Sequence, residues 1–251
     1  MNHFRDRIHA IVADREHGSS TLIEWIIDTL GDTRHLPTNR SEQRWALQEL
    51  RRIDRSMVVV HHLLDALGSE PGDDLPERVR QYAQQWSNLP SRITRGLLAS
   101  RDWRNARVLL HSHSGLLLAA ATEAHQRAPG IRFWQTRSEP GAEGVSQHAQ
   151  LDRRGVPCTL LADHAAIATP DLFDAALLGT DQFDDRHFVN KVGSQRIARA
   201  LVTAGKNVFV LGDSRKRVER LDYSEQLFEA APFTEGVWLV TEDGVYPAGR
   251  D

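Results

Sequence analysis

Hydrophobic residues in the first hundred positions recur at intervals of three and four, which places them on one face of a helix. Two such series cover residues 22–30 and 50–64. No run of alternating apolar and polar residues interrupts them. This pattern predicts a helical domain, which we assign to residues 1–103.

From about residue 105, short apolar runs alternate with longer segments of helical character. The runs cover residues 108–110, 131–134, 158–161, 175–178, 208–211 and 237–240. Segments 115–127 and 192–204 are examples of the intervening helices. This alternation is typical of βαβ units, so residues 104–251 are predicted to form a Rossmann-like α/β domain with a mostly parallel, doubly wound sheet.

Length and composition exclude disordered and fibrous proteins. The chain has 251 residues, of which 40% are hydrophobic, enough for a substantial core. The longest apolar runs, such as 116–121, are far shorter than the ~20 residues that cross a bilayer, and the N-terminal residues lack the apolar core of a signal peptide. We therefore expect a soluble cytoplasmic protein that makes no membrane contact.

Charge and cysteine content narrow the possible partners. The net charge is −3 and the basic residues are scattered, so no nucleic-acid partner is expected. The single cysteine, Cys158, excludes an internal disulfide framework and lies in an apolar stretch typical of a small buried hydrophobe. Only Lys191, Lys206 and Lys216 among the 31 basic residues are lysines. Lysine, unlike arginine, is a compact ammonium whose pKa can move, so a retained lysine is a candidate for a specific role.

Polar segments follow five of the predicted strands. They cover residues 111–115, 136–141, 163–164, 179–182 and 212–214 and are rich in hydroxyls, carboxylates and imidazoles. Each segment alone is typical of a loop. Ligands of doubly wound sheets bind at the carboxyl ends of the strands, so the concentration of these groups there predicts a binding site.

Residues 190–194 form the most distinctive of the polar segments. Asn190, Lys191, Gly193 and Ser194 are expected at the entrance to a helix beginning near Val192. Unpaired N–H groups at a helix N-terminus favour an anion, and phosphate is the natural candidate. Alternatively, Asn190 and Ser194 merely cap the helix and Lys191 is a surface charge.

Together with Gly179, Thr180 and Asp181, this segment resembles two signatures of one protein family. The signatures are glycine-alanine-aspartate and asparagine-lysine-isoleucine-glycine-threonine. The family contains methylthioribose-1-phosphate isomerase, ribose-1,5-bisphosphate isomerase and the alpha, beta and delta regulatory subunits of initiation factor two-B. Residues 140–144, 213–216 and 241–245 are similar to further segments of the family, and residues 17–19 and 55–57 are similar more thinly.

The resemblance implies a site for a phosphorylated small-molecule ligand, a pocket between the two domains, a homodimer, and no cofactor or metal. It gives Asp181 the role of general acid and base and places Ser112 at the position of a catalytic cysteine. The substrate-binding residues that it implies are Gly18, Ser19, Arg55, His111, His113, Arg137, Glu143, Asn190, Lys191, Gly193 and Ser194.

Three departures from the family pattern concern the chemistry of this site. Ser112 replaces the cysteine, and a serine hydroxyl needs an adjacent base to do comparable work. The neighbours of Ser112 along the strand point to the opposite face, whereas Asp181 could reach its hydroxyl. Glu139 and His17 stand where the family has arginines, which weakens a bidentate grip on phosphate.

Two functions therefore remain open. The first is an isomerase that interconverts the aldose and ketose forms of a phosphorylated ribose-type sugar, which Asp181 and Lys191 favour. The second is a non-catalytic binder of a sugar phosphate or nucleotide, similar to the regulatory subunits, which Ser112, Glu139 and His17 favour. A metal site is a weaker alternative, because pairs two apart arise easily among 12 histidines. Its possible ligands are His111, His113, His148, His164, His187, Asp163 and Asp181.

Overall fold

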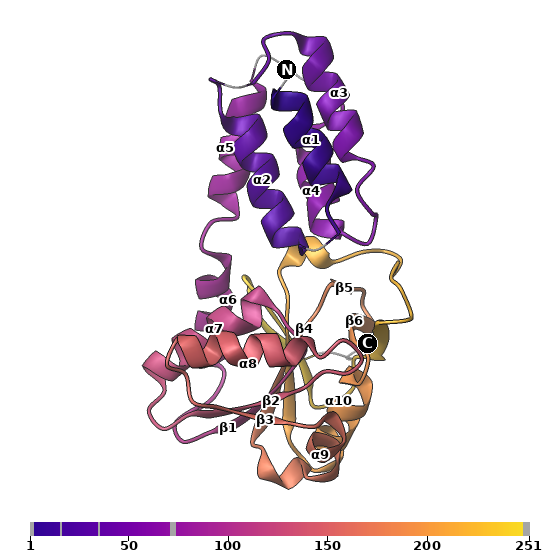
Figure 1. Ribbon diagram of the computed structural model, residues 1–251. Coiled ribbons are helices and arrows are strands. Elements are labelled where there is room, and N and C mark those ends of the chain that lie inside the picture. The colour runs from indigo at the N-terminus through magenta and orange to yellow at the C-terminus, as the bar shows by residue number, and fades with distance from the viewer. Residues whose placement is uncertain (1–2, 16, 35, 71–73, 248–251) are drawn as a thin grey trace. The chain divides into compact units, whose positions relative to one another are not determined.

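The computed structural model describes residues 3–15, 17–34, 36–70 and 74–247 (Figure 1). Its contacts divide the chain into two units, Met1–Ser87 and Asn88–Asp251. Within the described residues, none of the helices has both the length and the apolar character needed to span a membrane.

The first unit consists of helices packed around one apolar core, as the spacing predicts. Their bounds are α1 His3–Ala13, α2 Ser19–Gly31, α3 Arg40–Leu50, α4 Val58–Leu67 and α5 Leu75–Gln85. The core takes the apolar face of each helix, including Ile26, Leu47 and Leu63. The predicted series 50–64 does not belong to a single helix, because a turn at Asp54, whose carboxylate accepts the Ser56 N–H at 2.9 Å, separates α3 from α4.

The second unit is a mixed α/β fold with a seven-stranded sheet, which confirms the predicted fold class. The strands follow the order β10-β9-β7-β4-β1-β2-β3, and all neighbours are parallel except β10, which is antiparallel to β9. All six apolar runs predicted as strands are present. The strand bounds are β1 Arg107–His111, β2 Arg132–Thr136, β3 Cys158–Leu161, β4 Ala175–Gly179, β7 Asn207–Leu211, β9 Val237–Thr241 and β10 Gly244–Pro247.

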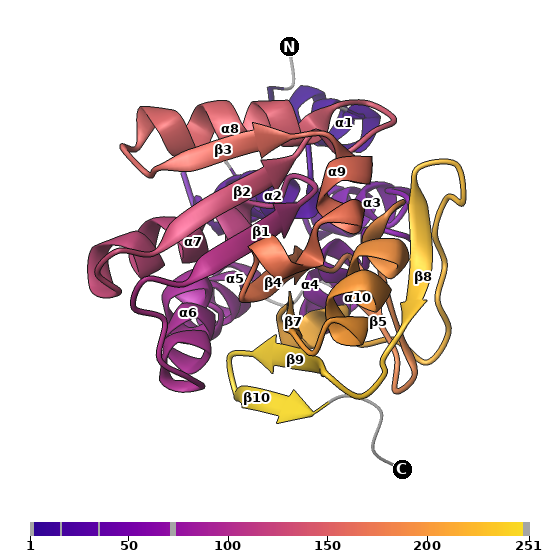
Figure 2. The ribbon, with the colours of Figure 1, turned by 90° about the horizontal axis from the view of Figure 1, so that it is seen from below.

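Helices cover both faces of this sheet (Figure 2). Successive strand residues point to opposite faces, so Leu110 and Leu177 pack in one core cluster whereas Leu109 and Leu178 pack in the other. Helices α6, α7 and α8 supply the first cluster, and α9 and α10 supply the second. The helix bounds are α6 Leu89–Ala99, α7 Gly115–Arg127, α8 Glu143–Arg153, α9 Asp163–Ala168 and α10 Ser194–Thr203.

Helix α6 groups with the sheet rather than with the preceding helices. Its apolar residues Ile93 and Leu97 lie in the same core cluster as Leu117 of α7 and Val108 of β1. By contacts, the second unit therefore begins at Asn88, ahead of the 103/104 boundary predicted from the change of sequence pattern.

A small antiparallel sheet, absent from the predicted elements, is formed by two strands before α10 and one strand after it. It has the order β5-β6-β8, with bounds β5 Gln182–Phe183, β6 His187–Lys191 and β8 Phe228–Pro232. Residues 190 and 191 thus end a strand, and α10 begins at Ser194 instead of near Val192. The strand escaped prediction because Phe188 and Val189 are buried by pairing with Ala231 and Ala230, partners about forty residues away that local periodicity does not reveal.

Candidate functional site

The winding of the large sheet reverses between β1 and β4. From β1 the chain continues outward to β2 and β3, whereas β4 is followed outward by β7 and β9. A crevice at such a reversal, at the carboxyl ends of the strands, is the usual ligand site of this architecture. Ser112 follows β1 and Asp181 lies just beyond β4, so the fold brings both predicted catalytic residues to adjacent strand ends.

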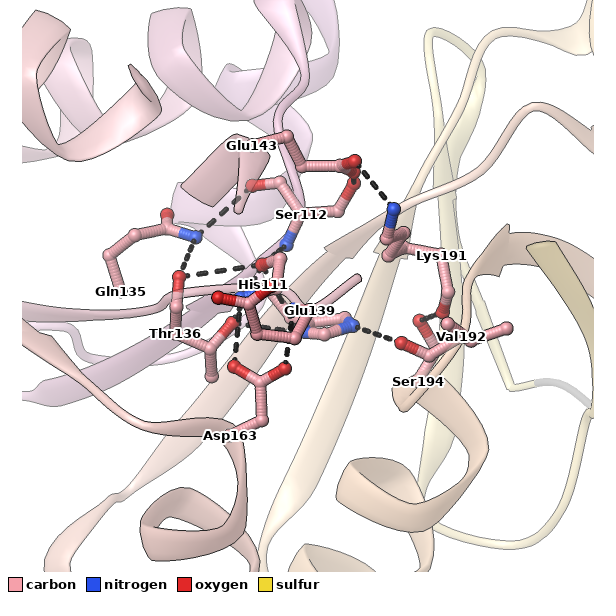
Figure 3. Close-up of polar contacts among 11 residues, drawn as sticks. His111, Ser112, Gln135, Thr136, Glu139, Glu143, Asp163, Lys191, Val192 and Ser194 are labelled. Carbon is pink, nitrogen blue, oxygen red and sulfur yellow. Dashed lines mark hydrogen bonds and ion pairs between the residues drawn. The ribbon is translucent and has the colours of Figure 1, made fainter. Parts of the chain in front are cut away.

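A three-residue polar cluster lies near the end of β1 (Figure 3). The Ser112 hydroxyl donates to Glu143 Oε1 at 2.5 Å, and Lys191 Nζ donates to Glu143 Oε2 at 2.7 Å. The Lys191 side chain is 1% exposed and that of Glu143 is 31% exposed. Lys191 is therefore a buried cation neutralised by Glu143, not a surface charge, and the acceptor for the Ser112 hydroxyl is a carboxylate of α8.

The backbone at Ser112 adopts a conformation that few non-glycine residues take. Ser112 has φ +73° and Ser138 has φ +64°, both in the left-handed region. The N–H of Ser112 donates to Ser138 Oγ at 2.8 Å, and Gln135 Nε2 donates to the Ser112 carbonyl at 3.1 Å. Asp163 holds the loop after β2 by accepting the N–H groups of Ser138 and Glu139, each at 2.8 Å. Surrounding hydrogen bonds thus fix the unusual turn at Ser112.

His111, the last residue of β1, is completely buried. Its Nδ1 lies 2.7 Å from Thr136 Oγ1, and its Nε2 lies 3.1 Å from the Val192 carbonyl oxygen. Burial lowers the pKa of the imidazole below its ordinary value, against the opposing charges of Asp163 and Glu143. The ring is therefore neutral at physiological pH, and both of its nitrogens contact the protein.

Asp181 follows β4, and its carboxyl group lies in a different environment from that of Glu143, which is bonded to Ser112 and Lys191. Its side chain is open to solvent, yet enough protein surrounds the carboxyl that desolvation raises its pKa above the ordinary value. The charge of Lys216 opposes this shift and that of Glu143 adds to it. Lys216 Nζ donates to the carbonyl of Thr180 at 2.6 Å, directly beside Asp181. A carboxyl with a raised pKa is suited to accept and return a proton near neutrality.

The remaining residues of the 190–194 segment are bonded mainly to one another. Asn190 Nδ2 donates to Ser194 Oγ at 2.9 Å, and Ser194 Oγ donates to the Lys191 carbonyl at 2.7 Å. Gly193 has φ +101°, and a Cβ added there would lie 3.2 Å from His111 Cε1, so this position requires glycine. The N–H of Gln195, in the first turn of α10, donates to the Glu229 carboxylate at 2.8 Å, which places a negative group where the sequence predicts a phosphate.

Other predicted binding residues lie at the surface of their own units. Arg137 Nε lies 3.6 Å from Glu139 Oε1, and the His113 ring is 3.0 Å from Gln150 Nε2. In the helical unit, Gly18 and Ser19 stand at the start of α2, and Arg55 is exposed in the turn before α4. Their participation in ligand binding stays a prediction.

Three of the five imidazoles considered for a metal site form other contacts. His111 contacts Thr136 and Val192, His113 contacts Gln150, and His148 lies 3.0 Å from the Cys158 carbonyl. Across the residues that the structure describes, no three His, Cys, Asp or Glu side chains are grouped so that they could hold a metal ion. The metal alternative therefore has no support from the geometry.

Buried polar residues surround this cluster, of which Thr136 and Ser138 belong to the predicted polar segment 136–141, whereas Gln135 and Gln147 were not predicted from the sequence. Gln135, Thr136 and Ser138 are fully buried polar residues at the end of β2, and Gln147 of α8 is buried with them. Gln147 accepts the Ser114 N–H at 2.7 Å and donates to Gln135 at 3.0 Å. A glutamine and a threonine ending an apolar strand are the available signal, because buried polar groups are retained where they find partners.

Comparison with known proteins gives a consistent set of relatives. Residues 36–244 match the family described as the Initiation factor 2 subunit family. A methylthioribose-1-phosphate isomerase from Dechloromonas aromatica is 27% identical over 96% of this chain and 78% of its own length. The translation initiation factor eIF2B subunit alpha of Caenorhabditis elegans is 25% identical over 119 residues, 47% of this chain but only 39% of that protein.

Two solved structures from Pyrococcus horikoshii OT3 share the fold. One is described as translation initiation factor eIF-2B and aligns over 97% of this chain and 96% of its own, with TM-score 0.80 and 18% identity. The other, a 5-methylthioribose 1-phosphate isomerase, aligns over 96% of this chain and 83% of its own, with TM-score 0.77 and 15% identity. At these identities the structural match establishes the fold.

Proposed function

The chain belongs to the Initiation factor 2 subunit family, and from this premise we propose that it is a sugar-phosphate isomerase. The substrate is a phosphorylated ribose-type sugar, and the reaction interconverts its aldose and ketose forms. The family also holds proteins named as initiation factor subunits, so membership alone does not choose between catalysis and regulation.

The observation that carries the proposal is the placement of Asp181 and of Ser112, with its partner Glu143, after the adjacent strands β4 and β1, where the winding of the sheet reverses. Aldose–ketose interconversion moves hydrogen between neighbouring carbon and oxygen atoms of the sugar. It needs a group that holds a proton near neutral pH and then releases it. The raised pKa of Asp181 favours this role, and the hydroxyl oxygen of Ser112, whose hydrogen is donated to Glu143, lies after the neighbouring strand as a hydrogen-bond acceptor.

We assign ligand contacts to the residues that the sequence nominates. Asn190, Lys191, Gly193, Ser194 and Glu143 receive the sugar hydroxyls and phosphate. Because Lys191 is paired with Glu143, a phosphate that reaches Lys191 has to share it with that carboxylate. Gly18, Ser19, Arg55, His113 and Arg137 are proposed as further contacts, in a homodimeric cytoplasmic protein without a cofactor.

One observation favours a second function, non-catalytic binding of a sugar phosphate or nucleotide. The position of the isomerases' cysteine holds Ser112, and its hydroxyl hydrogen is given to Glu143. A serine in this state is a much weaker acid than a thiol. A regulatory binder would keep the pocket and need no proton transfer.

The test is a panel of methylthioribose 1-phosphate, ribose 1,5-bisphosphate, ribose 1-phosphate and nucleoside monophosphates. Each compound is assayed for its effect on the melting temperature and for conversion to a ketose. The proposal expects one sugar phosphate both to raise the melting temperature and to be converted. Asp181→Asn should lower turnover about 10²-fold or more with little loss of binding, whereas Asp171→Asn, at an exposed position, should leave turnover unchanged. Stabilisation by a ligand that is never converted would support the regulatory function instead.

A further inference from the structure

The hydrogen-bond partners of His111 determine which ring nitrogen carries the proton. The Val192 carbonyl oxygen can only accept, so Nε2, at 3.1 Å, is the protonated nitrogen. Since the buried ring is neutral, Nδ1 carries no hydrogen and acts as an acceptor. Its partner at 2.7 Å, the Thr136 hydroxyl, must therefore donate to it.

This assignment fixes the direction of every hydrogen bond that follows. The only hydrogen of the Thr136 hydroxyl points to His111, so its oxygen accepts from the Ser138 hydroxyl at 2.9 Å. The Ser138 oxygen in turn accepts the N–H of Ser112 at 2.8 Å. Ser138, Thr136 and His111 are completely buried, so water does not compete for these bonds.

This series of hydrogen bonds ends at two segments, and each segment carries a side chain that donates a hydrogen bond to Glu143. One end terminates on the backbone of Ser112, whose hydroxyl donates to Glu143 Oε1. The other terminates on the carbonyl of Val192, next to Lys191, whose ammonium donates to Glu143 Oε2. These hydrogen bonds, together with the peptide bond between Lys191 and Val192, form a closed circuit, and Figure 3 shows the part of it around His111, Glu143 and Lys191. Gly193 leaves room for the imidazole, since a side chain there would press on the ring.

From this circuit we propose that His111, Thr136 and Ser138 are positioning residues. Acting through the single tautomer of His111, they hold Ser112 in its left-handed conformation with its hydroxyl aimed at Glu143. His111 thus orients Ser112 through buried hydrogen bonds and does not contact the ligand, in contrast to the binding role that the resemblance implies for it. The inference rests on the proposed function in one respect only, namely that Ser112 takes part in ligand binding or catalysis.

The first test measures the tautomer directly in the unmodified protein. Nitrogen-15 NMR of histidine-labelled protein distinguishes a protonated from an unprotonated ring nitrogen. We expect His111 to show protonated Nε2 and unprotonated Nδ1 at pH 7. A protonated Nδ1, or a charged ring at pH 7, would reverse the Thr136 bond and overturn the proposal.

The second test separates positioning by the Thr136 hydroxyl from simple packing. Thr136→Val keeps the shape of the side chain but breaks the circuit, whereas Thr136→Ser keeps the hydroxyl. We expect exchange of the Ser112 amide hydrogen to become about tenfold faster in Thr136→Val and to stay within about twofold of the parent in Thr136→Ser. Equal exchange in all three proteins, or equal acceleration in both variants, would contradict the proposal.

These measurements do not depend on catalysis. If the protein converts no sugar phosphate, the tautomer and the exchange rates still decide whether the circuit exists. If it does convert one, Thr136→Val should lower kcat with little change in KM, and Thr136→Ser should restore kcat. A loss of the circuit with full activity would leave the proposed function intact and remove the positioning role.

Discussion

The ion pair between Lys191 and Glu143 should respond unequally to the removal of its two partners. Removing Glu143 leaves an ammonium whose side chain is 1% exposed with no counter-charge. Removing Lys191 leaves a carboxylate that is 31% exposed and that still accepts the Ser112 hydroxyl. An uncompensated buried charge costs about 3–5 kcal/mol, whereas a charge that water partly reaches costs less.

We therefore expect Glu143→Ala to lower the free energy of unfolding by about 3–5 kcal/mol and Lys191→Met to lower it by about 1–3 kcal/mol. The double variant should cost less than the sum, because neither charge is then left alone. Lys206→Met is the matched control, since Lys206 lies in the turn before β7 away from this cluster, and it should stay within ~0.5 kcal/mol of the parent.

Urea unfolding followed by fluorine NMR of 5-fluorotryptophan-labelled protein measures these differences in the α/β unit alone. Trp103, Trp134 and Trp238 belong to that unit, whereas Trp25, Trp45 and Trp86 belong to the helical unit. Equal losses for Lys191→Met and Glu143→Ala, or losses no larger than that of Lys206→Met, would refute the buried-pair argument.

Three further predictions concern the charge at Asp181, the core and the single cysteine. Lys216→Met should raise the pKa of Asp181, because it removes an opposite charge, and Glu143→Gln should lower this pKa, because it removes a like charge. Carbon-13 NMR of the Asp181 carboxyl measures both pKa shifts. Shifts of the same sign in the two variants would contradict the prediction. Because folding raises this pKa, ionising Asp181 costs stability as pH rises through the window above its ordinary value. The stability of Asp181→Asn relative to the parent should therefore increase as pH rises above the ordinary pKa of an aspartate, and a relative loss of stability with rising pH would contradict this. Leu177→Ala, in the middle of β4 and 1% exposed, should cost about 2–5 kcal/mol, whereas Leu172→Ala, 39% exposed, should cost under ~1 kcal/mol in the same unfolding assay. Burial raises the pKa of Cys158 to about 12, so iodoacetamide at pH 8 should alkylate the folded protein at least ~100-fold more slowly than the urea-unfolded protein, and comparable rates would show an accessible thiolate.

The helices and strands that were predicted correctly are those whose burial produces a pattern within the element's own sequence. The six strands of the parallel sheet appear as short apolar runs because both of their faces are buried. Strand β6 was missed because its longer pairing is with β8, and helix α10 and strand β7 lie between these two strands in the sequence. The helix boundary near residue 192 shifted to Ser194 for the same reason.

For the candidate site, the sequence predicted which residues lie at the strand ends but did not predict which side chains contact one another. The strand-end positions of Ser112 and Asp181 follow from the order of strands and loops, so sequence reasoning reaches them. The bond from Ser112 to Glu143 and the burial of Lys191 depend on how α8 and β6 meet beside the sheet, which no local spacing encodes. The family resemblance implies a binding role for His111, yet its orientation toward Thr136 and Val192 depends on how the loops pack.

Conversion of a sugar phosphate by the parent protein, Asp181→Asn and Ser112→Cys tests the central claim most directly. Methylthioribose 1-phosphate, ribose 1-phosphate and ribose 1,5-bisphosphate are incubated with each protein in deuterium oxide, and ketose formation and deuterium content are followed by NMR. The isomerase account predicts slow conversion by the parent, about 10²-fold less by Asp181→Asn, and an equal or higher rate for Ser112→Cys, which restores a thiol near its reactive pKa. Tight binding of any of these compounds without conversion, even by Ser112→Cys, would contradict the account and identify the pocket as that of a regulatory binder.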